Sequence, residues 1–255
     1  MIARSLTLTA LAGIPSVKPG DDLSALLVAA LRRMQIQPRD KDVLVVAQKV
    51  VSKAEGRLID LKNVAPSVRA IALGEEVNKD ARLVEVILSE TDEIIRKQRD
   101  VLIVADRRGF IMANAGVDQS NVAGDDSDLV LLLPSDPDAS AAALKMQLDR
   151  EFGADMGIVI NDSFGRPWRY GVVGVALGAA GLPSLRSMVD TPDLFGRKMR
   201  VTEVAVADEI AAAASLLMGQ GAEGQPAVLL RGLDWDAPAA PASVLLRPKQ
   251  TDLFR

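Results

Sequence analysis

Short apolar runs recur along the chain with the length of β-strands. Residues 5–11 alternate apolar and polar positions, as a strand with one exposed face does. Continuous apolar runs follow at residues 43–47, 129–133, 157–160 and 227–230. Because a strand covered on both faces needs apolar residues at successive positions, these runs predict buried strands.

Helices are predicted between the strands. Residues 19–22 form a turn with a capping carboxylate and precede a helix over residues 23–34. An Ala-rich helix ends near Phe152, and residues 202–217 form another. Residues 80–99 combine apolar side chains on one face with basic residues in the last turns, which predicts one long amphipathic helix.

Glycine and proline mark the remaining segments. Residues 101–105 and 110–113 flank a short Gly-containing loop, which is typical of a hairpin. The glycines of residues 171–181 lack the G-x-G-x-x-G spacing, so they indicate close backbone packing or a strand that lines a ligand site. Residues 236–255 begin with a Pro- and Ala-rich stretch and predict an extended C-terminal tail.

The succession of strands and helices predicts an α/β protein, in the sense of a mixed α+β fold with mixed sheets and flanking helices. Only 3% of the residues are aromatic, so the core must be built mainly from Val, Leu, Ile and Ala, which disfavours an all-β sandwich. We see no internal repeat and no flexible linker. Residues 1–255 are therefore expected to form a single unit, built as one domain or as two interlocked subdomains.

The chain contains neither cysteine nor histidine. These absences exclude disulfides, thiolate nucleophiles, His-dependent catalytic triads and the usual zinc sites. Any metal ion must be held by oxygen ligands, which favours Mg²⁺ or Mn²⁺. The absence of cysteine is also compatible with a reducing compartment.

Charge and hydropathy limit the kinds of binding partner and the cellular location that are expected. A net charge of −4 argues against a nucleic-acid-binding protein, which would present a basic face. The basic clusters at residues 107–108 and 197–200 suit solvated surface better than local sites for anionic ligands. The uncharged run at residues 171–185 is too short to span a bilayer, and the N-terminus lacks a long apolar segment. We expect a cytoplasmic protein without a membrane partner.

Two aspartates stand where a metal and phosphate site would need them. Asp118 follows a Gly-containing turn, and Asp162 follows an apolar strand. Phosphate-bound Mg²⁺ needs only one or two protein carboxylates, but each aspartate alone also suits a helix cap or a turn. Lys53, Arg166 and Arg169 are candidates to neutralise a phosphate, and no P-loop motif is present.

Several segments resemble the coenzyme F420-0:L-glutamate ligase family, also called the F420 γ-glutamyl ligase family. They occur in the family's order and cover nearly the whole chain. The segments are GIPSVKPGDDL (13–23), VVAQKVVSKAEGR (45–57), NAGVDQSNV (114–122), VINDSFGRPWRYG (159–171), VALGAAGLPSL (175–185) and TEVAVADEIAAAASLLMGQ (202–220).

The resemblance implies a GTP-dependent ligase that adds L-glutamate to F420-0 and extends the chain through γ-linkages. It also implies an intertwined homodimer, two sites for Mg²⁺ or Mn²⁺, and K⁺ as a further cation. The resemblance implies that Asp118 and Asp162 bind the first metal ion and that Ser163 and Gln220 bind the second. Nucleotide contacts carry over to Ile14, Pro15, Ser16, Val17, Gln48, Lys53, Asn121, Met218, Gly219, Gln220, Gly221, Ala222, Glu223, Gly224 and Gln225.

One departure from the family pattern is visible at the two positions, 48 and 163, where Ser or Thr is expected in many relatives. Ser163 keeps the hydroxyl group, whereas Gln48 changes the reach of the contact and puts that assignment in doubt.

The implied chemistry needs no protein nucleophile. A carboxylate is a poor acyl donor until it becomes an acyl phosphate, and metal ions with cationic side chains can stabilise that phosphoryl transfer. Lys53, Asp118 and Asp162 are the predicted catalytic residues. Two alternatives use the same residues: a two-metal phosphohydrolase, which needs no glutamate, and a non-catalytic nucleotide or cofactor binder.

Overall fold

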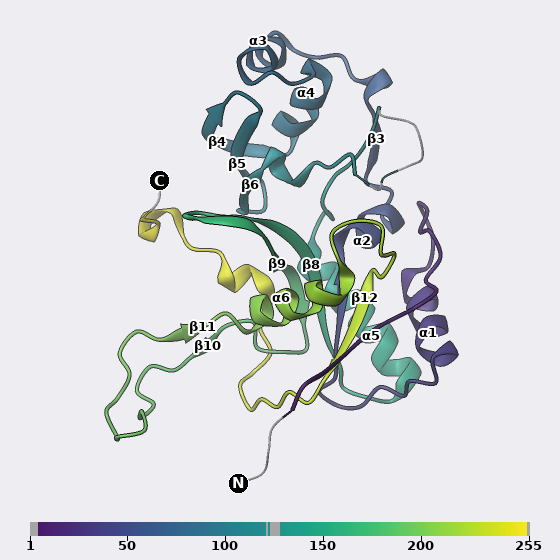
Figure 1. Ribbon diagram of the computed structural model, residues 1–255, viewed down its shortest axis with the longest axis vertical. Coiled ribbons are helices and arrows are strands. Elements are labelled where there is room, and N and C mark those ends of the chain that lie inside the picture. Colours follow the sequence, from purple (N-terminus) through teal and green to yellow (C-terminus); the bar gives the residue numbers. More distant parts are fainter. Residues whose placement is uncertain (1–4, 121, 123–127, 254–255) are drawn as a thin grey trace.

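A computed structural model describes residues 5–120, 122 and 128–253 of the chain. Its main body contains a five-stranded sheet in the order β1-β12-β2-β8-β9 (Figure 1). The strands are β1 (Thr7–Ala10), β12 (Ala227–Arg231), β2 (Val43–Ala47), β8 (Gly157–Arg166) and β9 (Arg169–Ala180). Only the β2–β8 pair within this sheet is parallel, so the prediction of a mixed sheet is confirmed.

Helices cover both faces of this sheet. The covering helices are α1 (Leu23–Arg33), α5 (Pro137–Phe152) and α6 (Val206–Met218). On β2, Leu44 and Val46 pack with α1 and α5, whereas Val43 and Val45 pack with α6. The continuous apolar run therefore belongs to a strand buried on both faces, as predicted.

The glycines of β9 allow these helices to approach closely. A Cβ atom at Gly178 would lie 2.1 Å from the carbonyl oxygen of Pro137 in α5, and one at Gly174 would lie 2.4 Å from that of Ala211 in α6. Both distances are too short for a real contact. The predicted role of these glycines in close backbone packing is confirmed.

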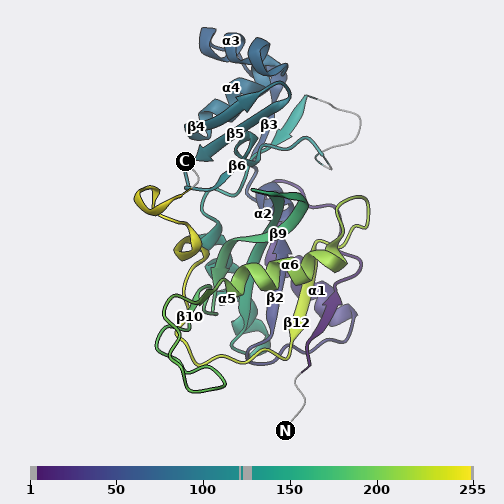
Figure 2. The same cartoon turned by 60° about the vertical axis from the view of Figure 1, so that its left-hand side comes forward.

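A smaller unit, made of residues 58–120 and 128–131, lies beyond one end of the main sheet (Figures 1 and 2). It contains the strand pair β3–β7 and the three-stranded sheet β4-β5-β6, with α3 and α4 packed on a shared apolar core. Its elements are β3 (Leu58–Asp60), η1 (Leu61–Asn63), α3 (Val68–Val77), α4 (Ala81–Ser89), β4 (Thr91–Gln98), β5 (Val101–Asp106), β6 (Ile111–Ala113), η2 (Asn114–Gly116) and β7 (Leu129–Leu131).

The predicted long helix over residues 80–99 is wrong. Helix α4 ends at Ser89, and β4 begins at Thr91 and pairs with β5. Ile94 and Ile95 fit the helical period of the preceding turns, but they are β-branched and equally suited to a strand. Hydrogen bonding to β5, which lies later in the chain, decides between the two. The hairpin of β5 and β6 is confirmed.

Smaller boundary differences occur elsewhere. The segment predicted to start the second Ala-rich helix contains the strand β11 (Glu203–Val204), and α6 begins only at Val206. The polar segment after β2 forms a helix, α2 (Gln48–Ala54). The described part of the C-terminal region contains two short 3-10 helices, η3 (Ala242–Leu245) and η4 (Lys249–Thr251).

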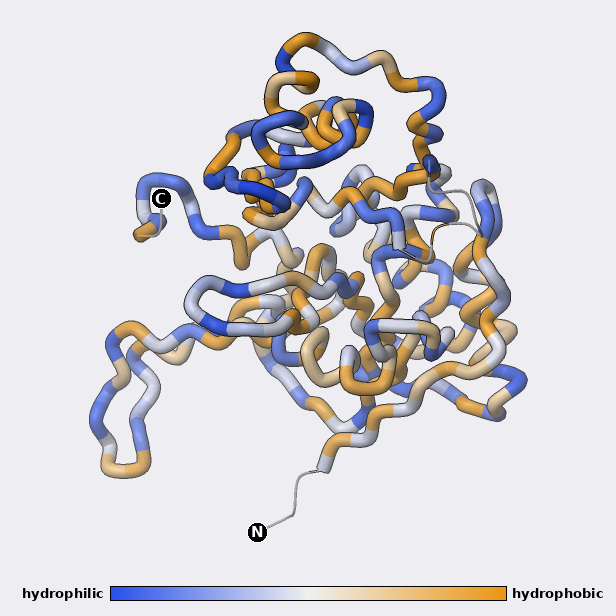
Figure 3. The backbone as a smooth tube through the Cα atoms, turned by 45° about the horizontal axis from the view of Figure 1, so that its top comes forward, coloured by the Kyte–Doolittle hydropathy of each residue, from blue (hydrophilic) through white to orange (hydrophobic). Residues whose placement is uncertain are grey.

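A hairpin formed by β10 (Arg186–Ser187), β11 and the loop between them projects away from the main body (Figure 1). Its tip carries Leu194 and Phe195, which are 97% and 95% exposed. Figure 3 shows hydrophobic positions at this tip, far from the helices and the main sheet. Across the residues that the structure describes, no helix is long and apolar enough to cross a bilayer.

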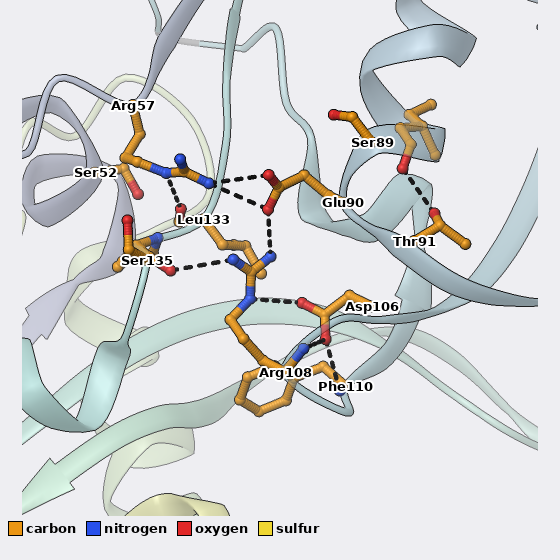
Figure 4. A network of polar contacts seen from close by, with 12 residues as sticks. Ser52, Arg57, Ser89, Glu90, Thr91, Asp106, Arg108, Phe110, Leu133 and Ser135 are labelled. Atoms are coloured by element: carbon orange, nitrogen blue, oxygen red, sulfur yellow. Dashed lines mark hydrogen bonds and ion pairs between the residues drawn. The ribbon is translucent and has the colours of Figure 1, made fainter.

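A polar network ties the smaller unit to the chain entering the main body (Figure 4). Glu90 accepts two hydrogen bonds of 3.1 Å from Nη2 of Arg57 and one of 3.0 Å from Arg108. Arg108 also donates to Asp106 at 2.7 Å, and Arg57 donates to the carbonyl oxygen of Leu133 at 3.0 Å. Arg108 is therefore mostly buried and ion-paired, so the interpretation as solvated surface is wrong for this residue, whereas Arg107 is exposed as expected.

Candidate active site

A cavity of about 480 Å³ opens at the carboxyl ends of the parallel strands β2 and β8. The start of α2 and the loop after α6 form its walls, together with the loop after β1. Ligands of α/β proteins usually bind in crevices at the carboxyl ends of the strands, at the point where the strand order reverses. The sheet topology alone therefore indicates that this cavity is a candidate ligand site.

Most of the predicted site residues meet here, although they come from distant parts of the chain. Those that line the cavity are Ile14, Pro15, Ser16, Gln48, Lys53, Asp162, Ser163, Met218, Gly219, Gln220, Gly221, Ala222, Gly224 and Gln225. Val17 instead packs in the apolar core, and Glu223 turns its carboxylate back to accept the Gly221 N–H at 2.8 Å. Asn121 lies outside the described residues.

Asp118 does not itself line the cavity, but it contacts Lys49, which does. The ammonium group of Lys49 lies 2.7 Å from Oδ2 of Asp118 and 2.6 Å from the hydroxyl of Ser120. Burial alone would raise the pKa of Asp118, but hydrogen bonds from Lys49 and Ser120 outweigh it and hold the pKa below its ordinary value. Asp118 is therefore an ionised carboxylate at neutral pH.

The backbone before Asp118 has an uncommon conformation. Asn114 and Ala115 have positive φ angles of 54° and 53°, and Gly116 follows with 71°. Non-glycine residues adopt this region at a cost and keep it only where the surroundings enforce it. Ala115 is fully buried in the core of the smaller unit, and the backbone of Asp118 is paired to Leu131 by two hydrogen bonds. Packing thus holds the turn that presents Asp118.

Asp162 lies on β8, in the wall of the same cavity. Burial raises the pKa of its carboxyl group to about 6, against the opposing effects of the Ser163 N–H and the charge of Lys49. The charge of Asp118 adds to the rise. The two aspartates are therefore close enough to repel each other, and a bound cation would relieve that repulsion.

The two residues predicted for a second metal are in direct contact. The hydroxyl of Ser163 donates to Oε1 of Gln220 at 2.7 Å. Ser163 belongs to β8, whereas Gln220 follows α6. Their contact brings together two neutral oxygen atoms, next to Asp162, that could act as metal ligands.

The side chains at this site could hold a metal ion that is also bound by a phosphate group. Asp118, Asp162, Ser163 and Gln220 all offer oxygen, the donor that Mg²⁺ and Mn²⁺ prefer. Within the described part of the chain, no group of three or more acidic, His or Cys side chains could hold a metal alone. Phosphate oxygens and water would have to complete the coordination shell, which fits a nucleotide-bound ion.

Two lysines bring positive charge to the cavity from α2. Burial lowers the pKa of Lys53, and the neighbouring charge of Lys49 lowers it further. An anionic ligand would favour the charged form of Lys53. Lys49 was not among the residues predicted from the sequence. Its spacing of four residues from Lys53 would place both on one face of a helix, but α2 was not predicted.

The other candidate cations lie elsewhere. Arg166 and Arg169 are at the turn between β8 and β9 and do not line the cavity. Arg166 donates to the carbonyl oxygen of Tyr170 at 3.3 Å. The cluster at residues 197–200 lies on the projecting hairpin, where its three basic residues are exposed.

Fold and site together define a class: an α/β protein with a crevice lined by a carboxylate, neutral oxygen atoms and two lysines, one of which is ion-paired with a second carboxylate. Comparison with known proteins makes the class specific. The family model for F420-0:γ-glutamyl ligase matches residues 13–232. This match covers most of the chain, and the chain therefore belongs to that family.

Curated relatives agree over nearly their full length. Proteins described as coenzyme F420:L-glutamate ligase from Methanothermobacter thermautotrophicus and Methanopyrus kandleri are each 44% identical to this chain. The alignments cover 98% and 94% of this chain and 99% and 93% of the relatives. A relative of the same description from Methanocaldococcus jannaschii is 37% identical over 95% of this chain and 94% of its own length. The predicted family is confirmed.

Proposed function

We propose that this protein joins L-glutamate to coenzyme F420-0, with GTP as the source of phosphoryl activation. The observation that carries the proposal is the ion pair between Lys49 and Asp118, next to the cavity that Lys49 and Asp162 line. Asp118 comes from the smaller unit, and Asp162 and Lys49 belong to the main body. A carboxylate pair with adjacent lysines is suited to a metal-bound triphosphate rather than to an uncharged ligand.

The reaction has two steps. The terminal phosphoryl group of GTP passes to the carboxylate of F420-0, and GDP leaves. The amine of L-glutamate then attacks the acyl phosphate, an amide bond forms and inorganic phosphate leaves. Lys49 and Lys53 offset negative charge on the transferring group, and the loop over residues 218–225 encloses the nucleotide.

Asp118 and Asp162 would hold one Mg²⁺ or Mn²⁺ ion, and Ser163 and Gln220 a second. Bound there, the ions would neutralise phosphate charge and align the phosphoryl group. The further cation K⁺, implied by the family resemblance, has no assigned residues and stays a prediction, as does the cytoplasmic location.

Mass spectrometry of the deazaflavin product tests this function. The purified protein is incubated with F420-0, GTP and Mn²⁺, with L-glutamate present in one tube and omitted from the other. Glutamate-dependent mass increases of one glutamyl residue each establish ligation and count the additions. Equal nucleotide hydrolysis in both tubes without a mass change would indicate a phosphohydrolase instead.

A homodimer is proposed as the active assembly. Large apolar side chains are exposed on the projecting hairpin and at the β8–β9 turn, namely Trp168, Tyr170, Leu194, Phe195 and Val201. Exposed apolar groups on an arm that touches little of its own chain suit a surface that packs against a second copy. Sedimentation equilibrium should give twice the chain mass, and the double variant Leu194→Ser with Phe195→Ser should shift the population toward monomer.

A further inference from the structure

Asn161 has a buried acceptor that the fold leaves unused. The residue is 6% exposed, and its Nδ2 donates to the hydroxyl of Ser215 at 3.1 Å and to the sulfur of Met218 at 3.3 Å. Both partners belong to α6. Oδ1 has no hydrogen-bond partner among the described residues. The contacts of Nδ2 fix the orientation of the amide, because the sulfur of methionine accepts hydrogen bonds but cannot donate them.

A buried carbonyl oxygen without a partner destabilises the folded chain. Nearly all such groups in proteins are paired, so an exception needs a reason. Ile158, Val159 and Ile160 on the same strand are fully buried and apolar. A leucine at position 161 would fill comparable space without leaving an unpaired oxygen, so packing alone does not explain the amide.

The position of Asn161 supplies a reason. It lines the cavity and directly precedes Asp162 and Ser163 on β8. An amide oxygen accepts hydrogen bonds, so it is mismatched to phosphate and carboxylate oxygens, which also accept. It therefore suits the part of a substrate that donates an N–H bond close to the metal-bound phosphates.

We propose that Oδ1 of Asn161 binds the amino group of the incoming L-glutamate. The inference rests on the proposed function and names the residue that holds the second substrate. The amine must approach the acyl phosphate to within about 3–3.5 Å before it attacks. The guanine base also has N–H donors, but it is the part of GTP farthest from the transferring phosphoryl group.

A neutral acceptor is better suited to this task than a carboxylate. The attacking nitrogen needs its lone pair, and a carboxylate beside it would favour the protonated, non-nucleophilic ammonium form. In the attack, the nitrogen lone pair forms the C–N bond, the C–O bond to phosphate breaks, and phosphate leaves with that electron pair. The nitrogen loses one proton to water, because Asn161 accepts a hydrogen bond without taking a proton.

The test compares Asn161→Leu, which removes the acceptor, with the wild-type protein. The variant should raise the KM for L-glutamate about tenfold, since one hydrogen bond to the amine is lost. Its Kd for a non-hydrolysable GTP analogue and for Mn²⁺ should stay within about twofold. Hydroxylamine added in place of glutamate should still trap the acyl phosphate as the hydroxamate, at the wild-type rate.

A second variant keeps the proposal testable if Asn161→Leu does not fold. Asn161→Asp preserves shape and introduces a carboxylate, so the pH profile of kcat/KM for glutamate should move to higher pH. Ser184→Ala, which removes a different buried hydroxyl outside the cavity, is the matched control and should leave the KM unchanged.

The outcomes separate the possibilities. An unchanged KM for glutamate in Asn161→Leu, or an unmoved pH profile in Asn161→Asp, overturns the proposal. Weaker binding of the GTP analogue with an unchanged KM would assign Asn161 to the base, and weaker Mn²⁺ binding would assign it to the metal, and each overturns the proposal. Absence of ligation by the wild-type protein would instead refute the proposed function.

Discussion

The ionised carboxylate of Asp162 destabilises the folded protein. Its pKa is raised to about 6 in the folded protein, whereas the ordinary value is 3.8. Between these two values the folded state binds a proton that the unfolded state has lost, so the free energy of unfolding falls as the pH rises through this window. Above pH 6 the free energy of unfolding stays lowered by the full amount, unless a bound cation offsets the charge of Asp162.

Asp162→Asn should therefore stabilise the metal-free protein while abolishing ligation. Asparagine keeps the acceptor for the Ser163 N–H and removes the buried charge. In EDTA-treated samples at pH 8, the free energy of unfolding should rise by up to about 3 kcal/mol. Urea titrations at pH 8 and pH 4 measure this, and the difference between variant and wild type should shrink at pH 4. A variant less stable than the wild type at pH 8 would contradict the prediction.

Lys49 is ion-paired with Asp118, and its charge also acts on Asp162. Lys49→Met keeps most of the side-chain volume and removes the ammonium group that contacts Asp118. We expect kcat/KM to fall at least about a hundredfold, because charge stabilisation of phosphoryl transfer is lost. Lys97→Met is the matched control, since Lys97 forms an exposed ion pair with Glu76 away from the cavity. Similar activity losses in both variants would argue against a specific role of Lys49.

Strand β9 shows how one element constrains the fold around the site. Its glycines let α5 and α6 pack directly onto the backbone of the strand that pairs with β8. This close approach fixes α6 against β8, and the loop that follows α6 lines the cavity. The position of Gln220 next to Ser163 depends on this packing.

Gly178→Ala should destabilise the protein by about 1–3 kcal/mol, because the added methyl group overlaps the backbone of α5. Gly165→Ala at the end of β8 is the control: an added Cβ meets nothing within 4 Å there, so its effect should stay within about 0.5 kcal/mol. Thermal unfolding of both variants measures the difference. Equal stability of the two would show that α5 shifts freely, contrary to the packing argument.

At the scale of the whole molecule, the hydrogen bonds around Glu90 hold the smaller unit in place next to the main body (Figure 4). The side chains of Glu90 and Arg108 are only 13% and 14% exposed. Breaking such an ion pair leaves a charge without its partner in a poorly solvated place. Because Asp118 comes from the smaller unit and Asp162 from the main sheet, the network also affects the distance between them.

Glu90→Gln should lower the free energy of unfolding by on the order of 3 kcal/mol. Hydrogen exchange should quicken mainly in α3, α4 and β4–β6, while the main sheet stays protected. Glu76→Gln removes a partner from an exposed ion pair and should change stability by less than about 1 kcal/mol. Uniformly faster exchange across both units would contradict the proposed local role of the network.

The sequence by itself determined the local elements and the chemical class of the site. Apolar runs such as Val43–Ala47 identify buried strands, because a strand covered on both faces has few other ways to avoid exposing its side chains. The absence of Cys and His limited a metal to oxygen ligands. Family membership followed from extended segments in their order, and most residues expected from the resemblance do line one cavity.

Tertiary structure decided what local patterns leave open. Residues 91–98 suit helix and strand alike, and only pairing with β5 makes them a strand. Arg108 looks like surface in the sequence, but Glu90 and Asp106 make it internal. Lys49 meets Asp118, and Asn161 keeps an unpaired oxygen, only once α2 and α6 have packed on the sheet. Local conformation follows from neighbours in sequence, whereas contacts between distant side chains depend on how the elements pack.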